Sequence, residues 1–423
     1  MPQPQGTLGH RIVTLATTGL TARCLPVELE GVISIHLSYP VPFSGGVGED
    51  LLQRLATGLL DRGTKRLTRE AFSEALEDTG AELSFSSDTG WVRARLRCLV
   101  RDTETLVPLL AECMRSPRFE PDECELVRQQ LISGLMRSRS NTGVRSSRAL
   151  RRRLYKAGHP HHVERVEDDL AYLGSVTPEK IRACWERTLQ PSAVQVAVVG
   201  DISESACRDM LETHLGDFAD NALPVSDHVT GVQEPGGREH IHIADRTNLD
   251  VRMGHAVGML RNHSQFEALY AGLFILGGNF SGRLMNTVRD RDGLTYGVRS
   301  SLSGGDVHWN GTWDTSISLS SENLERGIQR TLEEMTRFVE EGVTSAEAET
   351  VGLTLAGNYL VHLGTTGGMA STIRRHMERG LAATEVDEYP ERMRALSATD
   401  INAAIKTWLS PSALWICSAG TRQ

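Results

Sequence analysis

The residues of this sequence best suited to chemistry are an arginine and a tyrosine, Arg289 and Tyr296, in the stretch R-D-R-D-G-L-T-Y. Arginine donates a rigid fork of N–H groups and tyrosine donates a single O–H, so the pair suits a peptide carbonyl or the oxyanion formed from it. The same chemistry leaves an alternative open, in which Arg289 pairs with Asp290 or Asp292 on a solvated surface and Tyr296 fills a core.

Two local elements must hold this pair. The pattern of residues 281–288 predicts a helix whose last turns carry Arg289, and Gly293 supplies the backbone freedom that ends it. A strand is predicted to follow, with Tyr296 and Val298 on one face. Both side chains would then lie at one helix-to-strand corner.

Length and composition predict a soluble protein of two or more domains. The chain has 423 residues, of which 39% are hydrophobic and 23% charged. A net charge of -9 argues against nucleic acid as a partner. The seven cysteines are scattered and never in C-x-x-C spacing, which predicts reduced core thiols and a cytoplasmic protein. The polar N-terminus lacks a secretory pattern, and no stretch approaches the roughly 20 apolar residues of a membrane span.

An internal repeat predicts a duplicated domain. Residues 177–200 align with residues 397–420, and the Pro-Ser-Ala triplets within them begin at Pro191 and Pro411, which are 411 − 191 = 220 residues apart. A helix, a turn and an apolar strand are predicted at both places. One period therefore relates the two halves of the chain.

The predicted fold is α+β, with two homologous domains joined by a linker. The domains are predicted at residues 1–216 and 239–423, each an antiparallel or mixed sheet with helices packed on one face. Residues 217–238 contain two prolines and scattered polar residues, which is typical of a linker.

Three phrases make the sequence resemble a known family. They are G-G-N-F-S-G-R-L from Gly277, R-D-R-D-G-L-T-Y-G-V-R-S from Arg289 and V-A-V-V-G-D from Val196. The chain resembles the pitrilysin/insulinase family of zinc metallopeptidases over nearly its whole length, and most of all the short-chain branch that includes mitochondrial processing peptidase. The resemblance implies two α/β-roll domains that form half of a clamshell.

The zinc motif of that family is degenerate here. The family carries H-x-x-E-H on a helix, with a later glutamate as the third ligand. In this chain Arg54 and Gly58 stand at the two histidines, Thr57 stands at the glutamate, and the distant glutamate falls near Gly134. None of these side chains can hold zinc, so we expect no metal or other cofactor in this chain and no independent peptidase activity.

The resemblance implies a division of labour between two subunits. A homologous partner would carry zinc, while Arg289 would anchor the peptide substrate and Tyr296 would donate to the oxyanion. The implied protein is a non-catalytic subunit of a heterodimeric metallopeptidase that is inactive alone. Two alternatives stay open: a structural or peptide-binding scaffold with no role in proteolysis, and an orphan peptidase that uses unfamiliar ligands.

Two further features could carry function. One is the segment G-H-P-H-H, in which His159, His161 and His162 could form a metal site. Pro160 instead indicates a loop in which the histidines bind no metal. The arginine-rich helix predicted over 137–156 could line a chamber for acidic peptides or present a solvated face.

Overall fold

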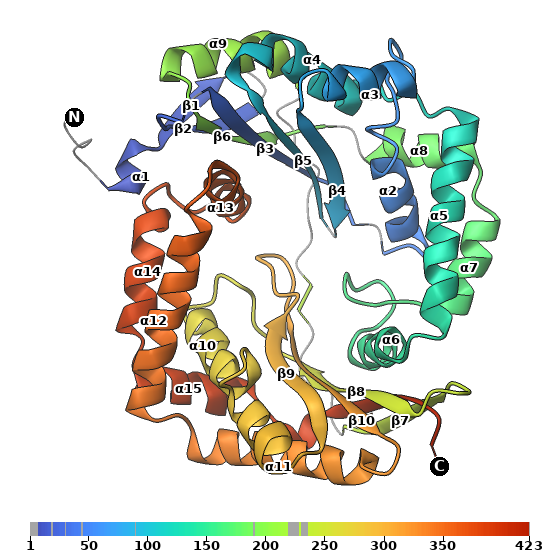
Figure 1. The fold of residues 1–423 in the computed structure, drawn as a ribbon, viewed down its shortest axis with the longest axis vertical. Coiled ribbons are helices and arrows are strands. Elements are labelled where there is room, and N and C mark those ends of the chain that lie inside the picture. The colour runs from blue at the N-terminus through green and yellow to red at the C-terminus, as the bar shows by residue number, and fades with distance from the viewer. Residues whose placement is uncertain are drawn as a thin grey trace. The chain divides into compact units, whose positions relative to one another are not determined.

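The computed structural model describes residues 7–17, 20–29, 31–43, 45–88, 90–188, 191–218, 228–229 and 236–422. The chain forms two compact units, each built on one β-sheet (Figure 1). The first unit comprises residues 1–132, 171–225 and 358–390, and the second comprises 133–170, 226–357 and 391–423. Each unit therefore contains a segment from the other half of the chain.

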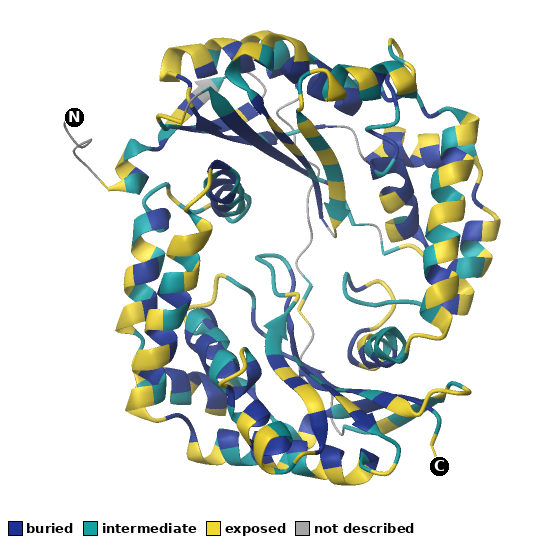
Figure 2. Cartoon of the chain, in the orientation of Figure 1, coloured by how far each residue is buried: buried dark blue, intermediate teal, exposed yellow. Residues whose placement is uncertain are grey.

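The sheet of the first unit has six strands in the order β1-β2-β6-β3-β5-β4. In that order the strands are Val13–Thr17, Leu20–Pro26, Val194–Gly200, Val32–Pro40, Trp91–Leu99 and Glu82–Asp88. β2 and β6 run parallel, and the other neighbours run antiparallel. β3 and β6 are buried along almost their whole length (Figure 2), which is typical of strands covered on both faces. β6 is largely apolar, whereas β3 alternates apolar residues with the buried polar residues Ser34, His36 and Ser38.

The sheet of the second unit has five strands in the order β7-β11-β8-β10-β9. In that order the strands are Arg238–His242, Trp415–Gly420, Asn248–Ala256, Thr312–Ser320 and Thr295–Ser303. This order matches β2-β6-β3-β5-β4 strand for strand, including the single parallel pair. The repeated plan and the α+β fold class predicted from the sequence are confirmed.

Helices cover both faces of the first sheet, because a helix from the other half lies against the face opposite α4 and α9 (Figure 1). The helices of this unit are α1 Leu8–Arg11, α2 Glu49–Thr57, α3 Arg69–Glu77, α4 Thr103–Arg115, α8 Pro178–Thr188, α9 Glu204–Leu215 and α13 Thr366–Glu378. α13 places Ala370, Ile373 and Met377 on one face, where they pack with Leu25 and Val199. The sequence predicted helices on one face only, and this helix adds a second cover.

The second sheet receives the reciprocal contribution. Its helices are α6 Thr142–Leu154, α10 Phe266–Gly277, α11 Leu324–Glu341 and α15 Ala398–Trp408. α6 packs on β8 and β11 through Leu150 and Leu154, which contact Ala256 and Cys417. The remaining helices, α5 Pro121–Arg139, α7 Val166–Gly174, α12 Ser345–His362 and α14 Glu385–Ala395, cross from the residues of one unit into those of the other.

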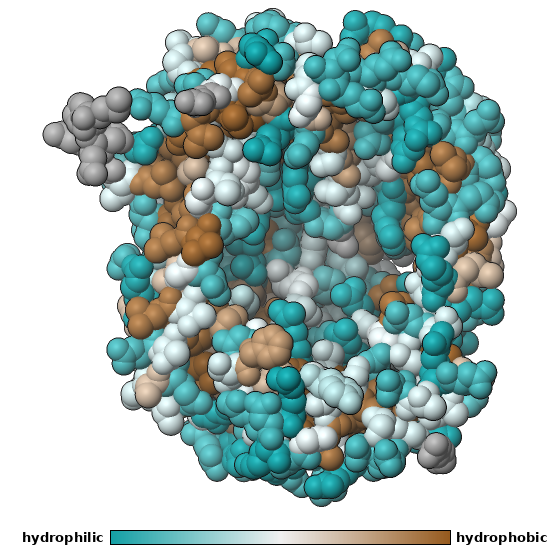
Figure 3. Space-filling view, in the orientation of Figure 1, coloured by the Kyte–Doolittle hydropathy of each residue, from teal (hydrophilic) through white to brown (hydrophobic). Residues whose placement is uncertain are grey.

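The predicted linker, 217–238, lies largely outside the described residues, so the boundaries 1–216 and 239–423 stay a prediction. All seven cysteines are buried and free, as predicted for reduced core thiols. No helix in the described part of the chain is long and apolar enough to cross a bilayer. Hydrophilic side chains cover much of the face shown in Figure 3, with apolar side chains in scattered patches.

Candidate functional site

Arg289 lies in a π-helix, Met285–Arg291, in the second unit. The helix ends at Gly293, whose φ of 61° lies in the left-handed region that favours glycine. At this end the amide of Gly293 donates to the carbonyl of Arg289 at 3.0 Å, and the amide of Leu294 donates to that of Val288 at 3.0 Å. The predicted role of Gly293 is confirmed, but the predicted helix is wider than an α-helix. Such π-turns occur often at functional sites.

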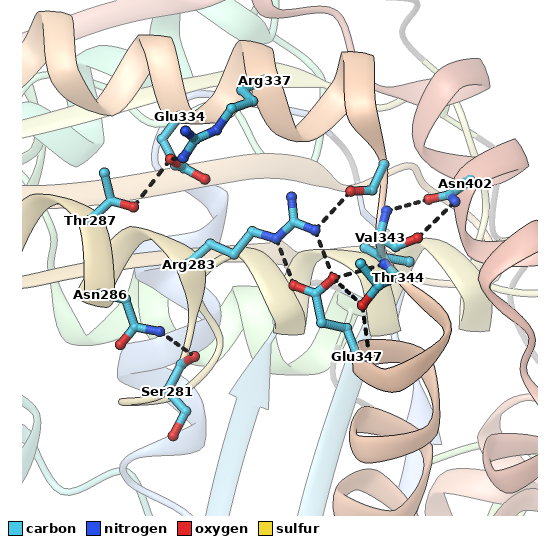
Figure 4. A network of polar contacts seen from close by, with 11 residues as sticks. Ser281, Arg283, Asn286, Thr287, Glu334, Arg337, Val343, Thr344, Glu347 and Asn402 are labelled. Atoms are coloured by element: carbon cyan, nitrogen blue, oxygen red, sulfur yellow. Dashed lines mark hydrogen bonds and ion pairs between the residues drawn. The ribbon is translucent and has the colours of Figure 1, made fainter.

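The π-helix is fixed to α11 by a buried polar contact (Figure 4). The hydroxyl of Thr287 donates to the carboxylate of Glu334 at 3.1 Å, and both residues are buried. Arg337 pairs with the same carboxylate and so compensates its charge. Displacing Thr287 would leave this buried carboxylate with one donor fewer, which costs stability, so the contact helps to hold the turn in place.

A second contact ties the start of the same helix to α12 (Figure 4). Arg283 donates two hydrogen bonds of 2.7 Å to Glu347 and one of 2.8 Å to the carbonyl of Gly342. The guanidinium of Arg283 lowers the pKa of Glu347 to about 2, with further hydrogen bonds from Thr344. This planar, two-bond geometry is specific to arginine.

Arg289 itself is half exposed. Its guanidinium lies 3.7 Å from Asp290, which is longer than a hydrogen bond, and 5.7 Å from the ring centre of Phe280. Asp292 pairs instead with Arg291 and Arg330. An exposed pair of this length contributes little, so the fork of Arg289 is available to a ligand.

Tyr296 is 98% exposed, because a β-bulge turns it outward. Val298 pairs with Ile317 and Thr295 pairs with Leu319, so two residues of β9 lie opposite one of β10. The extra residue breaks the alternation, and Thr295 and Val298 are both buried while Tyr296 is not. The prediction that Tyr296 and Val298 share a face is wrong, and so is the alternative that Tyr296 fills a core.

The hydroxyl of Thr295 stabilises this bulge. It accepts a hydrogen bond of 3.1 Å from the amide of Gly297 and donates one of 2.6 Å to the carbonyl of Ser318. These two contacts link Thr295, just before Tyr296, to Gly297, just after it, and to Ser318 on the neighbouring strand β10. β9 is an edge strand of its sheet, so the tyrosine stands at a border that a ligand can reach.

The two predicted residues therefore lie at the two ends of one turn, with a cation at the end of the π-helix and a phenol at the start of β9. Both are accessible, and both are hydrogen-bond donors. Phe280, 76% exposed, adds an apolar surface beside Arg289. Sequence reasoning missed Phe280, although it lies within the G-G-N-F phrase, and it missed the support given by Thr295 and Arg283.

The degenerate zinc positions offer no ligand atoms suited to a cation. Arg54 is exposed on α2, Thr57 is buried with its hydroxyl unpaired, and Gly58 ends that helix. Gly134 lies on α5, within the residues of the second unit. In the residues that the structure describes, no group of three or more His, Cys, Asp or Glu is placed to hold a metal ion.

The three histidines of the G-H-P-H-H loop all contact protein groups. His159 stacks on Tyr155 with ring centres 4.3 Å apart, His161 lies 2.8 Å from the carbonyl of Gly304, and His162 lies 2.9 Å from the carbonyl of Tyr155. Burial lowers the pKa of both His159 and His161 to about 4. The geometry indicates a structural loop.

Comparisons with known proteins place these observations in context. A family model described as "Peptidase M16 inactive domain" matches residues 175–351. The non-peptidase homolog YmxG of Helicobacter pylori is 22% identical over 363 residues, which cover 84% of this chain and 81% of that protein. An uncharacterized zinc protease of Streptomyces coelicolor is 19% identical over 359 residues, covering 82% of this chain and 76% of that protein.

A solved structure, the peptidase M16 inactive domain from Pseudomonas fluorescens, has the same fold as this chain. Its TM-score is 0.86 at 21% identity, and the match covers 97% of this chain and 98% of that one.

Proposed function

We infer that this chain, whose residues 175–351 belong to the peptidase M16 inactive domain family, is the metal-free subunit of a two-chain zinc metallopeptidase and supplies Arg289 and Tyr296 to the reaction. The family match and the relatives named above confirm the resemblance to the pitrilysin/insulinase peptidases. The partner subunit, the peptide substrate and the cytoplasmic location are parts of the proposal.

The observation that carries the proposal is the exposure of Tyr296. A tyrosine that is 98% exposed contributes no packing energy to its own fold. The bulge that exposes it is nevertheless held by two hydrogen bonds of the Thr295 hydroxyl, one donated and one accepted, and the neighbouring π-helix is held by two sets of polar contacts. A supported structure around an exposed donor is what a binding or catalytic role requires.

In the proposed mechanism, zinc held by an H-x-x-E-H motif of the partner would supply the activated water. This chain then contributes two donors that need not move during the reaction. Arg289 orients the peptide through its carbonyl groups with two parallel N–H bonds, and Tyr296 donates its O–H to the oxygen on which negative charge develops. Fixed donors aimed at that oxygen stabilise the transition state more than the ground state.

The test uses the full chain mixed with a homologue that carries H-x-x-E-H. We expect cleavage of an unfolded peptide by the mixture, and Tyr296→Phe is expected to lower kcat by roughly 100- to 1000-fold, because one oxyanion donor is lost. Arg289→Lys keeps the charge but removes the fork, and is expected to raise KM. Tyr270→Phe, which removes a phenol from α10 of the same unit, is the matched control.

The scaffold alternative makes the opposite prediction. The Helicobacter pylori relative is named a non-peptidase homolog, and this name agrees with the scaffold alternative. If Tyr296→Phe and Tyr270→Phe support equal cleavage by the mixture, the chain serves assembly only and the catalytic role of Tyr296 is refuted.

A further inference from the structure

We propose that a pocket on the second unit, lined by Arg145, Arg148, Arg152 and Arg165, binds a carboxylate carried on a short carbon chain. The pocket has a volume of about 350 Å³ and lies among α6, the start of α7 and β7. It involves neither Arg289 nor Tyr296. The proposal therefore goes beyond the function inferred above and does not depend on it.

The sequence of α6 builds one wall of this pocket, which we call the arginine pocket. Arg145, Arg148 and Arg152 follow an i, i+3, i+7 spacing and share one face of the helix. Leu150 and Leu154 occupy the opposite face and pack on the sheet, as Figure 1 shows for α6 over β8. The apolar contact fixes the helix, so its three arginines project where the sheet does not cover them.

The arginines differ in how well their charge is compensated. Arg145 pairs with Glu167 at 2.6 Å, and Arg148 pairs with Asp169 and also donates to the carbonyl of Glu164 at 2.7 Å. These two guanidinium groups have close anionic partners. They can take part in binding an anion but do not require one.

Arg152 is compensated much less. Its guanidinium lies 3.8 Å from Glu239, beyond hydrogen-bond distance, and that carboxylate is already bound by Arg153 at 2.6 Å. Burial lowers the pKa of Arg152, and the charges of Arg165, Arg148 and Arg145 lower it further, against the opposing effect of Glu239. A bound anion would relieve this repulsion and give Arg152 a hydrogen-bond acceptor.

The composition of the lining indicates which anion fits. With Arg153, which binds Glu239, the four lining arginines make five positive charges, and they face the four carboxylates of Glu167, Asp168, Asp169 and Glu239, which leaves a single surplus positive charge. One surplus charge matches one carboxylate better than it matches a doubly charged phosphate. Val166 and Ile241 complete the lining with apolar surface, which suits the carbon chain that carries the carboxylate.

The experiment measures binding to the full chain by titration calorimetry at low ionic strength. The probes are butyrate, its neutral analogue butyramide, inorganic phosphate, a short peptide with a free C-terminal carboxylate, and the same peptide with a C-terminal amide. We expect butyrate or the free-carboxylate peptide to bind with a Kd of about 1 mM or tighter, and the neutral forms not to bind. Binding to butyrate assigns the pocket to free acids, and binding to the peptide alone assigns it to peptide ends.

Three variants locate the binding. Arg152→Met is expected to weaken it at least about tenfold, because a charged hydrogen bond is lost. Arg151→Met, at the exposed neighbouring position of the same helix, is the matched control and is expected to change nothing. Glu239→Gln removes the competing carboxylate and is expected to tighten binding severalfold, a gain that damage to the fold could not produce.

Several results would overturn the proposal. These are the absence of carboxylate binding at millimolar concentrations, phosphate binding as tight as that of butyrate, or equal losses in Arg151→Met and Arg152→Met. Near-ultraviolet circular dichroism checks that each variant is folded. If Arg152→Met does not fold, Arg165→Met, at an exposed position of the same pocket, repeats the test.

Discussion

Replacing Thr295 by valine tests whether the bulge in β9 is what holds Tyr296 outward. Valine has nearly the shape of threonine, so packing is retained while the hydroxyl is lost. The amide of Gly297 then loses its acceptor and the carbonyl of Ser318 loses its donor. At about 0.5–1.5 kcal/mol for each hydrogen bond, the free energy of unfolding of the second unit should fall by about 1–3 kcal/mol.

Two assays separate this local effect from a general loss of stability. Hydrogen exchange followed by mass spectrometry should show faster exchange in a peptide covering residues 294–300, with α6 unchanged. In the two-subunit cleavage assay, kcat should fall because Tyr296 is no longer held in one place. Thr295→Ser keeps the hydroxyl and is the control. If exchange in this peptide is unchanged in Thr295→Val, the bulge does not depend on Thr295 and the reasoning is refuted.

Two further predictions concern one support of the site, the Arg283–Glu347 contact, and one buried histidine, His36. Arg283→Met should lower the free energy of unfolding by about 1–3 kcal/mol. A double-mutant cycle with Glu347→Gln, measured by urea unfolding, should give a coupling energy of at least about 0.5 kcal/mol. Additive effects of the two substitutions would contradict the pairing. Burial, together with the charges of Arg374 and Arg95, lowers the pKa of His36 to about 3. Below pH 6.5 the unfolded chain therefore binds a proton that the folded chain does not, so the protein becomes less stable as the pH falls. His36 alone should lower the free energy of unfolding by about 2 kcal/mol at pH 5. Thermal unfolding of His36→Asn between pH 7 and pH 5 should show a smaller loss than the wild type, and equal losses would exclude His36 as a source.

The sequence predicted the elements of the site well and their detailed geometry poorly. Gly293 ends the helix as expected, because left-handed backbone is a local property of glycine. The bulge depends on how Tyr296 and Gly297 are matched against Ser318 in another strand, and residue alternation within β9 contains no such information. Likewise, the contact between Arg283 and Glu347 joins residues 64 positions apart.

The repeat was visible in sequence because both copies keep a helix, a Pro-Ser-Ala turn and a buried strand in the same order. The sequence did not show that each sheet is covered by a helix from the other half of the chain. The periodicity of α13 shows that Ile373 and Met377 share a buried face, but it does not say which sheet they contact. That choice depends on long-range packing with residues such as Leu25.

The reciprocal exchange of residues 133–170 and 358–390 determines how the protein can be divided. The first half of the chain, produced alone, would expose the apolar residues that pack under α13, because that helix belongs to the second half. A protease that cuts between the two halves of the chain should therefore leave two fragments that stay bound to each other. Neither fragment produced separately would contain the helix that covers its own sheet.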